Sequence, residues 1–498
     1  MGIPSYFSYI IRNFPKIVKK IEANDEILHH LFLDCNSIVY DSVHKYKDTV
    51  PTDQEIIDSV LNKISDYIIL VRPSKTVFIA FDGVAPFAKM KQQKKRRHKT
   101  HFVSQVFPDT QHKWDTLKIT PGTDFMKNLS VQITDFFMNT EQKYGIQTMI
   151  VSTSNEPGEG EHKLFKYIRE NNLVDDNVII YGLDSDLFML SIFNHKYYKN
   201  AYIFREAPEF LKSKIELLTK VQSNDDTFLV DIGLLRICIL REMGFSDSNR
   251  IYDYVFMCFF LGNDFLPQFP AWNIRTHGIT ALLDVYNKIF SKKMDTYLIK
   301  YKEQHFEICW ENVDLLISYM SKLEHQFLLE EYSIREKFDK WIWNEPKTME
   351  ERDKMFQNMP VINRAGERYI CPTENGWEQR YYQLLFSDKE ILNSNEIRKI
   401  CQNYLEGLNW CLIYYTHDCS DWRWSYLYKY GPLFIDLKNE VKNKDCLTIL
   451  NNLAITNNIK KQPMTQDEQL LYVLPSKNQN KGKVELMWHY KRYIWECE

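Results

Sequence analysis

Residues Thr148 to Asp186 read TMIVSTSNEPGEGEHKLFKYIRENNLVDDNVIIYGLDSD, and this stretch decides the fold of the chain. An apolar strand is predicted at Thr148–Thr153, followed by the acidic turn PGEGEHK at Pro157–Lys163. A helical run at Leu164–Glu170 leads to a second apolar strand at Asn177–Tyr181. Strand, helix and strand form a βαβ unit, and open α/β sheets place their functional groups beyond the carboxyl ends of the strands.

Two pairs of carboxylates follow these two strands. Glu159 and Glu161 lie in the turn after the first strand, and Asp184 and Asp186 lie in GLDSD after the second. Four carboxylates at one sheet edge repel one another unless cations lie between them. Oxygen ligands in this number suit Mg²⁺, with Mn²⁺ as a substitute, better than zinc. The alternative is two solvated loops whose acids cap helices, but two doublets after two strands favour the metal site.

The rest of the first half alternates strands and helices. A strand is expected at Leu31–Tyr40, a helix at Asp53–Val71, a strand at Thr76–Asp82 and a basic helix after Pro86. This alternation continues to about residue 206 and predicts an α/β fold, with a mostly parallel central sheet and helices on both faces.

Three more acids have positions comparable to those of the two doublets. Asp34 and Asp82 interrupt or end apolar strands, and Asp264 lies in a glycine-containing turn after an apolar helix. A lone Asp at a strand end is usually a cap, but a larger set of acids has a chemical use. Two divalent ions about 4 Å apart activate a water and stabilise the leaving oxygen in phosphodiester cleavage. The predicted catalytic and metal-binding residues are Asp34, Asp82, Glu159, Glu161, Asp184, Asp186 and Asp264.

The helix after Pro86 carries a basic run, KMKQQKKRRHK, at Lys89–Lys99. A solvated face or a localisation signal is the ordinary explanation of such a run. One helical stripe nevertheless carries Lys89, Gln93, Arg96 and Arg97, and it starts just after Asp82. Arginine and lysine side chains beside a metal site are suited to a phosphate, so this stripe is the predicted phosphate site.

Length and composition limit the remaining possibilities. A chain of 498 residues with 44% hydrophobic and 26% charged residues is expected to form more than one globular unit. We divide it into a unit at 1–290 that carries the acids and the basic helix, a connecting helical or irregular segment at 291–375 and an aromatic-rich, mainly helical region at 376–498. The tract Asn344–Asn375 is polar and weakly periodic and is predicted to be irregular or a linker.

Net charge and the spacing of the cysteines argue against several classes of protein. The net charge of −3 means that nucleic-acid binding requires a local basic patch. None of the ten cysteines forms a CxxC pair, which argues against a zinc ribbon and against a secreted disulfide framework. No membrane-spanning run or secretory signal is predicted, so we expect an intracellular protein.

Taken in order, the motifs resemble the Xrn/Rat-type 5′→3′ exoribonuclease family. Those similar to its first conserved region are MGIPSYF (Met1–Phe7), LDCNSIVY (Leu33–Tyr40), FDGVAPFAKMKQQKKRR (Phe81–Arg97), ITPGTDFM (Ile119–Met126), PGEGEHK, YGLDSDL and LGNDFLP (Leu261–Pro267). Those similar to its second are YLEGLNW (Tyr404–Trp410), DWRWSYLYKYGP (Asp421–Pro432) and EQLLYVLP (Glu468–Pro475). The resemblance spans nearly the whole chain and is least clear around residues 290–370.

The resemblance implies a PIN/FEN-like nuclease core and a Mg²⁺-dependent enzyme with two ions. Such an enzyme degrades 5′-monophosphorylated single-stranded RNA processively to nucleoside 5′-monophosphates. It implies the seven acids as metal ligands, the basic stripe as the 5′-phosphate pocket, and a base-stacking column. The family has a His in that column where this sequence has Tyr40, and Trp422 and Trp424 are both candidates for the opposite wall.

Several further expectations follow from the same resemblance. They are a monomer without membrane attachment, decapping factors as partners, and a cytoplasmic location (the host cytoplasm for a viral protein), with the nucleus left open. The long C-terminal modules of large family members and the CxxC knuckle of some nuclear members are absent from this sequence. Two alternatives stay open: a flap-type structure-specific DNA nuclease, and a catalytically silent RNA-binding protein.

Overall fold

The computed structural model describes most of the chain. The described residues are 5–20, 27–46, 49–106, 114–207, 227–276, 278–293, 295–303, 305–340, 344–358, 362–386, 392–443, 450 and 462–475. The last part of the predicted second region, 476–498, therefore lies outside the described residues.

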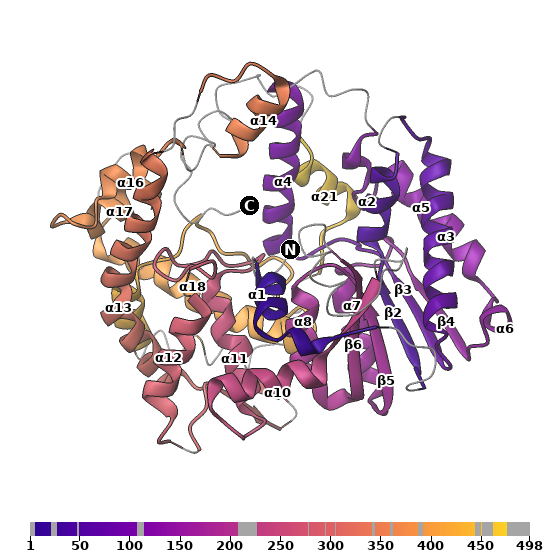
Figure 1. The fold of residues 1–498 in the computed structure, drawn as a ribbon, viewed down its shortest axis with the longest axis horizontal. Helices are drawn as coiled ribbons and strands as arrows, with labels where there is room; N and C mark the ends of the chain where they lie inside the picture. The colour runs from indigo at the N-terminus through magenta and orange to yellow at the C-terminus, as the bar shows by residue number, and fades with distance from the viewer. Residues whose placement is uncertain are drawn as a thin grey trace.

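A sheet of seven strands forms the centre of the first half (Figure 1). The strands are β1 (Val18–Lys19), β2 (His30–Asp34), β3 (Thr76–Ala80), β4 (Thr148–Ser152), β5 (Leu173–Tyr181), β6 (Tyr198–Glu206) and β7 (Thr227–Asp231). Their order is β1-β7-β6-β5-β2-β3-β4. The pairs among β6, β5, β2, β3 and β4 are parallel, whereas β7 is antiparallel to both β6 and β1. The predicted mostly parallel α/β fold is confirmed.

The register brings the carboxyl ends of four parallel strands level with one another. Asp34 pairs with Ala80, and Ala80 pairs with Ser152. On the other side of β2, Leu33 pairs with Tyr181. The loops that leave β2, β3, β4 and β5 therefore start side by side at one edge of the sheet.

Helices cover both faces of this sheet. The helices of this half of the chain are α1 (Tyr6–Asn13), α2 (Asn36–His44), α3 (Asp53–Val71), α4 (Phe87–Val106), α5 (Asp124–Phe137), α6 (Glu141–Tyr144), α7 (Gly160–Asn171), α8 (Asp186–Phe193), α10 (Ile232–Met243) and α11 (Arg250–Cys258). Alternate residues of β2 point to opposite faces, as expected for a strand. Leu31 and Leu33 join a core with α2, α3 and α5, whereas Phe32 joins a second core with α1, α7 and α8.

One element prediction near the site is wrong. The strand expected at Leu31–Tyr40 ends at Asp34, and α2 begins at Asn36. The apolar residues Ile38, Val39 and Val43 follow helical spacing and are buried against the α3 side of the sheet. A short apolar run fits a strand or a buried helix equally well, and here tertiary packing stabilises the helix. Tyr40 therefore lies on α2 rather than on a strand.

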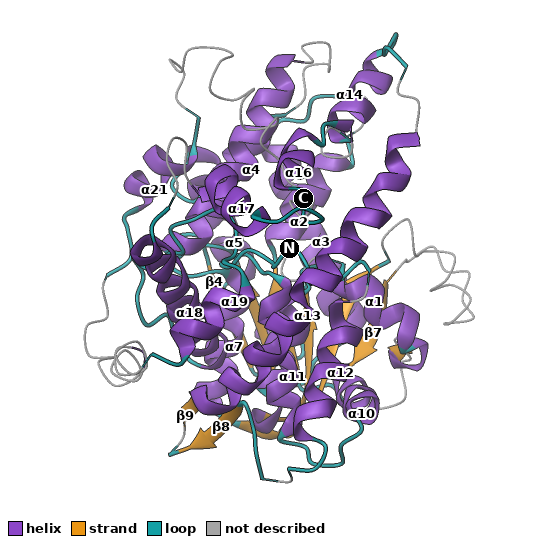
Figure 2. Cartoon of the chain, turned by 90° about the vertical axis from the view of Figure 1, so that its left-hand side faces the viewer, coloured by secondary structure: helices purple, strands orange, loops and turns teal. Residues whose placement is uncertain are grey.

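The second half is mainly helical and rich in buried aromatic side chains. Its elements are α12 (Gly278–Phe290), β8 (Ile299–Lys302), β9 (His305–Ile308), α13 (Trp310–Glu336), α14 (Met349–Gln357), α16 (Ala365–Ile370), α17 (Trp377–Phe386), α18 (Ser394–Thr416), α19 (Phe434–Val441) and α21 (Gln466–Val473). The tract predicted to be irregular, Asn344–Asn375, contains the short helices α14 and α16. Figure 2 shows α13, α17 and α18 in front of the sheet.

Helix ends in this half follow ordinary capping chemistry. Asn393 and Glu396 form a capping box at the start of α18, and Thr465 and Glu468 form another at the start of α21.

The larger hydrophobic core contains residues from α1 as well as from α18 and α19, so both halves pack on each other. None of the described helices combines the length and apolarity that crossing a membrane requires.

Candidate active site

Six of the seven predicted acids lie at the level edge formed by the parallel strands. Asp34 ends β2, and Asp82 follows β3 by two residues. Glu159 and Glu161 lie at the start of α7, while Asp184 and Asp186 follow β5. The βαβ geometry thus brings the acids together as the strand ends predicted.

The first acidic group contains Asp34, Asp82 and Glu161, each with a carboxylate oxygen within 4.8 Å of the others. Asn36 donates to Asp82 over 2.5 Å, and the backbone N–H of Gly160 donates to the same carboxylate over 2.6 Å. A Cβ at position 160 would lie 2.5 Å from Asp34 Oδ1, so the glycine is what lets the backbone approach this closely.

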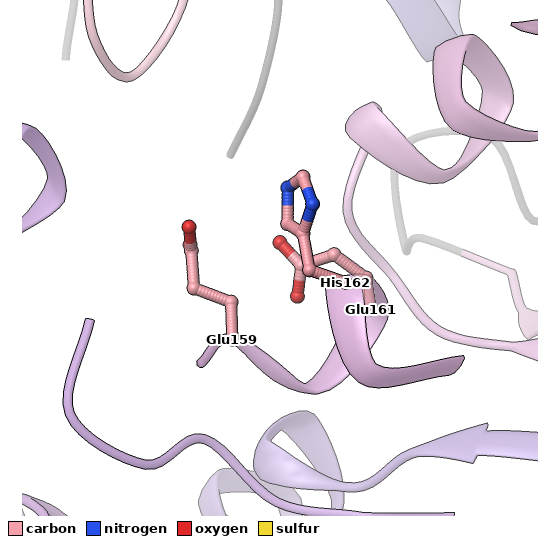
Figure 3. Close-up of side chains that lie close together, drawn as sticks. All are labelled: Glu159, Glu161 and His162. Carbon is pink, nitrogen blue, oxygen red and sulfur yellow. The ribbon is translucent and has the colours of Figure 1, made fainter. Parts of the chain in front are cut away.

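The second acidic group lies at the first turn of α7. Carboxylate oxygens of Glu159 and Glu161 and a ring nitrogen of His162 all lie within 4.8 Å of one another. Figure 3 shows the three side chains projecting to one side of this turn. Glu161 belongs to both groups and so joins them. Tyr414, on α18, donates its hydroxyl to Glu159 over 2.9 Å and stacks on His162 with ring centroids 3.6 Å apart.

Lys89 lies among the acids rather than beside them. Its Nζ is 2.5 Å from Glu159 and 2.7 Å from Asp264, which brings the seventh predicted acid to the site. Gln92, one turn of α4 further on, donates to the other oxygen of Asp264 over 2.9 Å. Asp186 accepts from the hydroxyl of Tyr415 over 2.6 Å. The cation on Lys89 offsets part of the negative charge that burial would otherwise penalise.

Burial and mutual repulsion raise the pKa of most of these carboxyl groups. Burial, with Asp82 and Asp184 nearby, raises the pKa of Asp34 well above its ordinary value. Burial and the charges of Glu159 and Asp34 do the same to the pKa of Glu161. Burial followed by the charge of Asp264 raises the pKa of Asp186 to about 7. Such shifts mark a site that holds more negative charge than its surroundings stabilise.

The pKa values of two acids are lowered instead, because nearby positive charge has a larger effect on them than burial has. Burial alone would raise the pKa of Asp264, but Lys89 lowers it below the ordinary value. Burial would also raise the pKa of Asp184, but positive charges that include Lys89 and Arg96 lower it below the ordinary value. The reciprocal effect raises the pKa of Lys89 well above its ordinary value despite its burial.

The donor set fits a hard divalent cation. Asp34 Oδ1 is buried and has no hydrogen-bond partner in the described part of the chain, next to the carboxylates of Asp82 and Glu161. A buried carboxylate oxygen without a donor is rare, and a cation would satisfy it. Carboxylate oxygens from several strands are the ligands that Mg²⁺ and Mn²⁺ prefer.

The predicted phosphate residues extend from this cluster along α4. Gln93 is buried, and its Oε1 has no partner among the residues described. Arg97 donates from Nε to Thr120 Oγ1 over 3.1 Å and from Nη2 to the carbonyl of Ile119 over 3.4 Å. Arg96 is exposed. Burial lowers the pKa of Arg97 below its ordinary value.

The three aromatic candidates have different surroundings. Tyr40 is half-buried at the edge of the core formed with α2 and α3. Trp424 stacks on Trp410 with ring centroids 5.1 Å apart and lies against Gly407 of α18, where a Cβ would be 2.8 Å from its ring. Trp422 lines a pocket of about 200 Å³ together with His162, Tyr414 and others. Both tryptophans are half-buried and pack against the larger core, but of the two only Trp422 lines this pocket.

Sequence reasoning missed five side chains that contact the predicted site or lie within it. These are Asn36, Gln92, His162, Tyr414 and Tyr415. Asn36 and His162 stand within two residues of predicted acids, so proximity in sequence was an available signal. Tyr414 and Tyr415 had no such signal, because about 230 residues or more separate them from their partners.

Comparison with known proteins identifies the family of the chain. Residues 1–207 match the family model of the XRN 5′-3′ exonuclease N-terminus, and residues 245–371 and 370–488 match that of the Xrn1 helical domain. The chain belongs to the Xrn family. The two models together span the strand-end acids, Asp264 and helix α18, which carries Tyr414 and Tyr415.

Relatives in the Xrn family come from distant organisms. The chain is 25% identical over 660 residues to the 5′-3′ exoribonuclease 2 of Debaryomyces hansenii and 25% identical over 547 residues to the 5′-3′ exoribonuclease 1 of Homo sapiens. Both comparisons cover 96% of this chain, but 64% and 31% of the respective relatives. The 5′-3′ exoribonuclease 2 of Saccharomyces cerevisiae is 29% identical over 367 residues, covering 60% of this chain and 36% of the relative. The chain thus spans less than two thirds of the length of these relatives.

Proposed function

We propose that this protein is a divalent-metal-dependent 5′→3′ exoribonuclease. Its substrate would be single-stranded RNA with a 5′-monophosphate, degraded processively to nucleoside 5′-monophosphates. The observation that carries this proposal is the convergence of seven acids with a basic helix, in a chain of the Xrn family. The relatives named above are called 5′-3′ exoribonucleases, which supports the same reaction.

The acidic groups would hold two Mg²⁺ ions, with Mn²⁺ as a substitute. One ion would be held by Asp34, Asp82 and Glu161, and the other by Glu159 of the second group together with Asp184, Asp186 and Asp264. When bound, such a pair supplies an activated water and charge stabilisation for the leaving oxygen of a phosphodiester. Around it, Gly160 and Asn36 hold Asp82 in place, and Tyr414 and Tyr415 orient Glu159 and Asp186.

The residues of α4 would bind the 5′-phosphate. Gln93, Arg96 and Arg97 follow Lys89 along one stripe of the helix, directly beyond the acids. Arg97 is already fixed by Thr120, which suits a guanidinium that must meet a phosphate at a set place. Lys89 would move from the acids toward the phosphate once cations neutralise the cluster. Cleavage one nucleotide from this pocket leaves a new 5′-phosphate, so each product is again a substrate.

The bases nearest the 5′ end would stack between Tyr40 and a tryptophan of the second region. Trp422 is the better candidate, because it lines a pocket while Trp424 packs on Trp410. Tyr40 offers a flat aromatic face without the protonatable nitrogen of a histidine.

Organisation and biological setting form part of the same proposal. We assign 1–290 to a nuclease core, 291–375 to a connecting segment and 376–498 to a region that completes the pocket. We further propose that the protein acts as a monomer in the cytoplasm, on RNA that decapping factors supply with a 5′-monophosphate.

A digestion time course tests the proposed reaction. One RNA is prepared with a 5′-monophosphate, a 5′-triphosphate or a 5′-hydroxyl and is incubated with and without Mg²⁺. Release of nucleoside monophosphates from the 5′-monophosphate RNA, and far less from the other two, is the expected result. Preferential cutting of a branched DNA flap would instead identify a structure-specific nuclease, and binding without release would identify a silent RNA-binding protein.

A further inference from the structure

Helix α21, almost at the C-terminal end of the described chain, contacts the loops that carry the site. It lies beside α4 (Figure 1). Val473 packs with Val84 and Met90 in a small separate core, and Tyr472 lies against Phe87 with ring centroids 5.0 Å apart. None of the predicted metal-binding acids or phosphate-binding residues lies on this helix, so the proposed reaction leaves its role unexplained.

Two glutamines on α21 bind the backbone of two site loops. Gln469 is fully buried, and its Oε1 accepts the N–H of Ala85 over 3.1 Å. Gln466 donates from Nε2 to the carbonyl of Ser154 over 2.9 Å. Ala85 stands between Asp82 and the start of α4, whereas Ser154 stands between β4 and the turn with Glu159. One helix thus holds the loop after β3 and the loop after β4.

These two loops are also joined directly to each other. Gly83 donates its N–H to the carbonyl of Gly158, and Gly158 donates to the carbonyl of Val84. A Cβ at Gly83 would lie 1.7 Å from the carbonyl oxygen of Glu156, so the loops touch at the backbone. A displacement of the Ala85 turn would therefore move Asp82, Glu159 and the start of α4 together.

A third loop rests on the same helix. A Cβ at Gly122 would lie 2.9 Å from Gln466 Cβ and 3.0 Å from Leu470 Cδ1. The turn at Gly122 directly follows Thr120, which accepts from Arg97. The partner that fixes the candidate phosphate-binding arginine is thus supported by α21 as well.

We propose that Gln469 is a positioning residue that sets the metal-binding acids and the phosphate-binding helix in register. The inference rests on the proposed function, since it deepens the account of that same site. Gln469 acts through the backbone of Ala85: its acceptor holds the turn that separates Asp82 from Lys89. A misplacement of a positioned group by about 1 Å can lower a rate on the order of 10²-fold. The reaction rate is therefore expected to depend strongly on the relative position of the acids and the phosphate-binding helix.

The experiment compares Gln469→Met with Gln469→Glu and Val473→Ala. Met keeps the length and apolar bulk of Gln469 but leaves the Ala85 N–H buried without an acceptor, whereas Glu keeps an acceptor at the same distance. Val473→Ala loosens the packing of α21 without removing that hydrogen bond. Each variant is assayed for kcat and KM on 5′-monophosphate and 5′-hydroxyl RNA, for melting temperature, and for hydrogen exchange of the peptide containing Ala85.

Gln469→Met is expected to lose exchange protection at Ala85, to lower kcat on the order of 10-fold to 100-fold, and to lower the preference for 5′-monophosphate RNA. Gln469→Glu should recover part of the exchange protection, of kcat and of the preference. Val473→Ala should lower the melting temperature and leave the preference at the wild-type value. A wild-type kcat and preference in Gln469→Met would overturn the proposal, as would a parallel loss of melting temperature and activity in Gln469→Met and Val473→Ala. If the wild-type protein releases no nucleotides, the proposed reaction fails, while hydrogen exchange still reports whether Gln469 holds the turn.

Discussion

Without bound metal, the acidic cluster should make the folded protein less stable as the pH rises. Asp186 is 3% exposed, and its pKa is raised to about 7 by burial and then by Asp264. In the unfolded chain the same group has a pKa of about 3.9. Because the folded protein keeps a proton that the unfolded chain releases, this stabilisation is complete below about pH 4 and is lost as the pH rises through about 7. The difference amounts to about 4 kcal/mol of unfolding free energy.

Other buried acids act in the same window, so a variant must isolate the contribution of Asp186. Burial raises the pKa of Asp253 to about 7 and that of Glu324 to about 8, and both lie outside the site. The lowered pKa values of Asp184 and Asp264 have the opposite sign, and their contribution is lost only as the pH falls below about 4. The contributions of Asp253 and Glu324 are shared by the wild-type protein and Asp186→Asn and cancel in the difference. Asp264 interacts with Asp186, so the difference between the two proteins reports the titration of Asp186 together with this interaction.

The assay is urea unfolding of both proteins in EDTA between about pH 4 and about pH 8. Asn keeps an Oδ1 that accepts from the Tyr415 hydroxyl, which is 2.6 Å from Asp186 in the wild-type protein. Asp186→Asn should match the wild type near pH 4 and exceed its unfolding free energy by about 4 kcal/mol near pH 8. Saturating Mg²⁺ should stabilise the wild type by about 2.7 kcal/mol at 100 times its Kd and stabilise the variant less. An identical pH dependence in the two proteins would refute the assignment of the raised pKa to Asp186.

Three further substitutions test separate parts of the site. Asp184→Ala should abolish nucleotide release while RNA binding persists in a filter assay, and near-wild-type turnover would remove Asp184 from the metal site. Arg97→Ala should lower the rate ratio of 5′-monophosphate to 5′-hydroxyl RNA about 10-fold to 100-fold, because a charge-assisted hydrogen bond contributes about 1.5–3 kcal/mol; an unchanged ratio would contradict the pocket. Trp422→Ala should weaken binding of single-stranded RNA by about 1–3 kcal/mol, whereas Trp424→Ala should destabilise the fold by about 3–5 kcal/mol in thermal melts; the reverse outcome would exchange their roles.

The central sheet and its acids were predictable because their positions depend on local patterns. Apolar runs ending in acids, separated by helical segments, imply parallel strands whose carboxyl ends meet at one edge. The register of β2 with β3 and β5 brings Asp34, Asp82 and Asp184 to that edge as expected. Asp264 was harder to predict, since its place depends on Lys89 and Gln92 of α4 rather than on a strand.

The errors in element assignment have a common physical origin. The run after Asp34 has branched apolar residues that suit a strand, yet Ile38 and Val39 are fully buried on the first turns of α2. The polar tract Asn344–Asn375 contains α16, in which Glu367 is bound by Arg335 from α13 and by Arg364. α2 packs on α3, and α16 is bound by Arg335 from α13. Each helix is thus stabilised by a partner from another helix, which the local pattern alone could not show.

The residues that complete the site come from the half of the chain with the weakest local signal. Tyr414 and Tyr415 are adjacent on α18, but their hydroxyls reach Glu159 and Asp186, which follow different strands. From sequence, a tyrosine in a helix is predicted to be a core residue, and the partner of its hydroxyl depends on how that helix docks against the sheet. Docking of the second half thus supplies donors that the parallel-strand edge cannot provide. The two hydroxyl donors from α18 fix where the carboxylates of Glu159 and Asp186 point. The second half is therefore expected to determine the geometry in which the acids act, even though the acids themselves lie in the first.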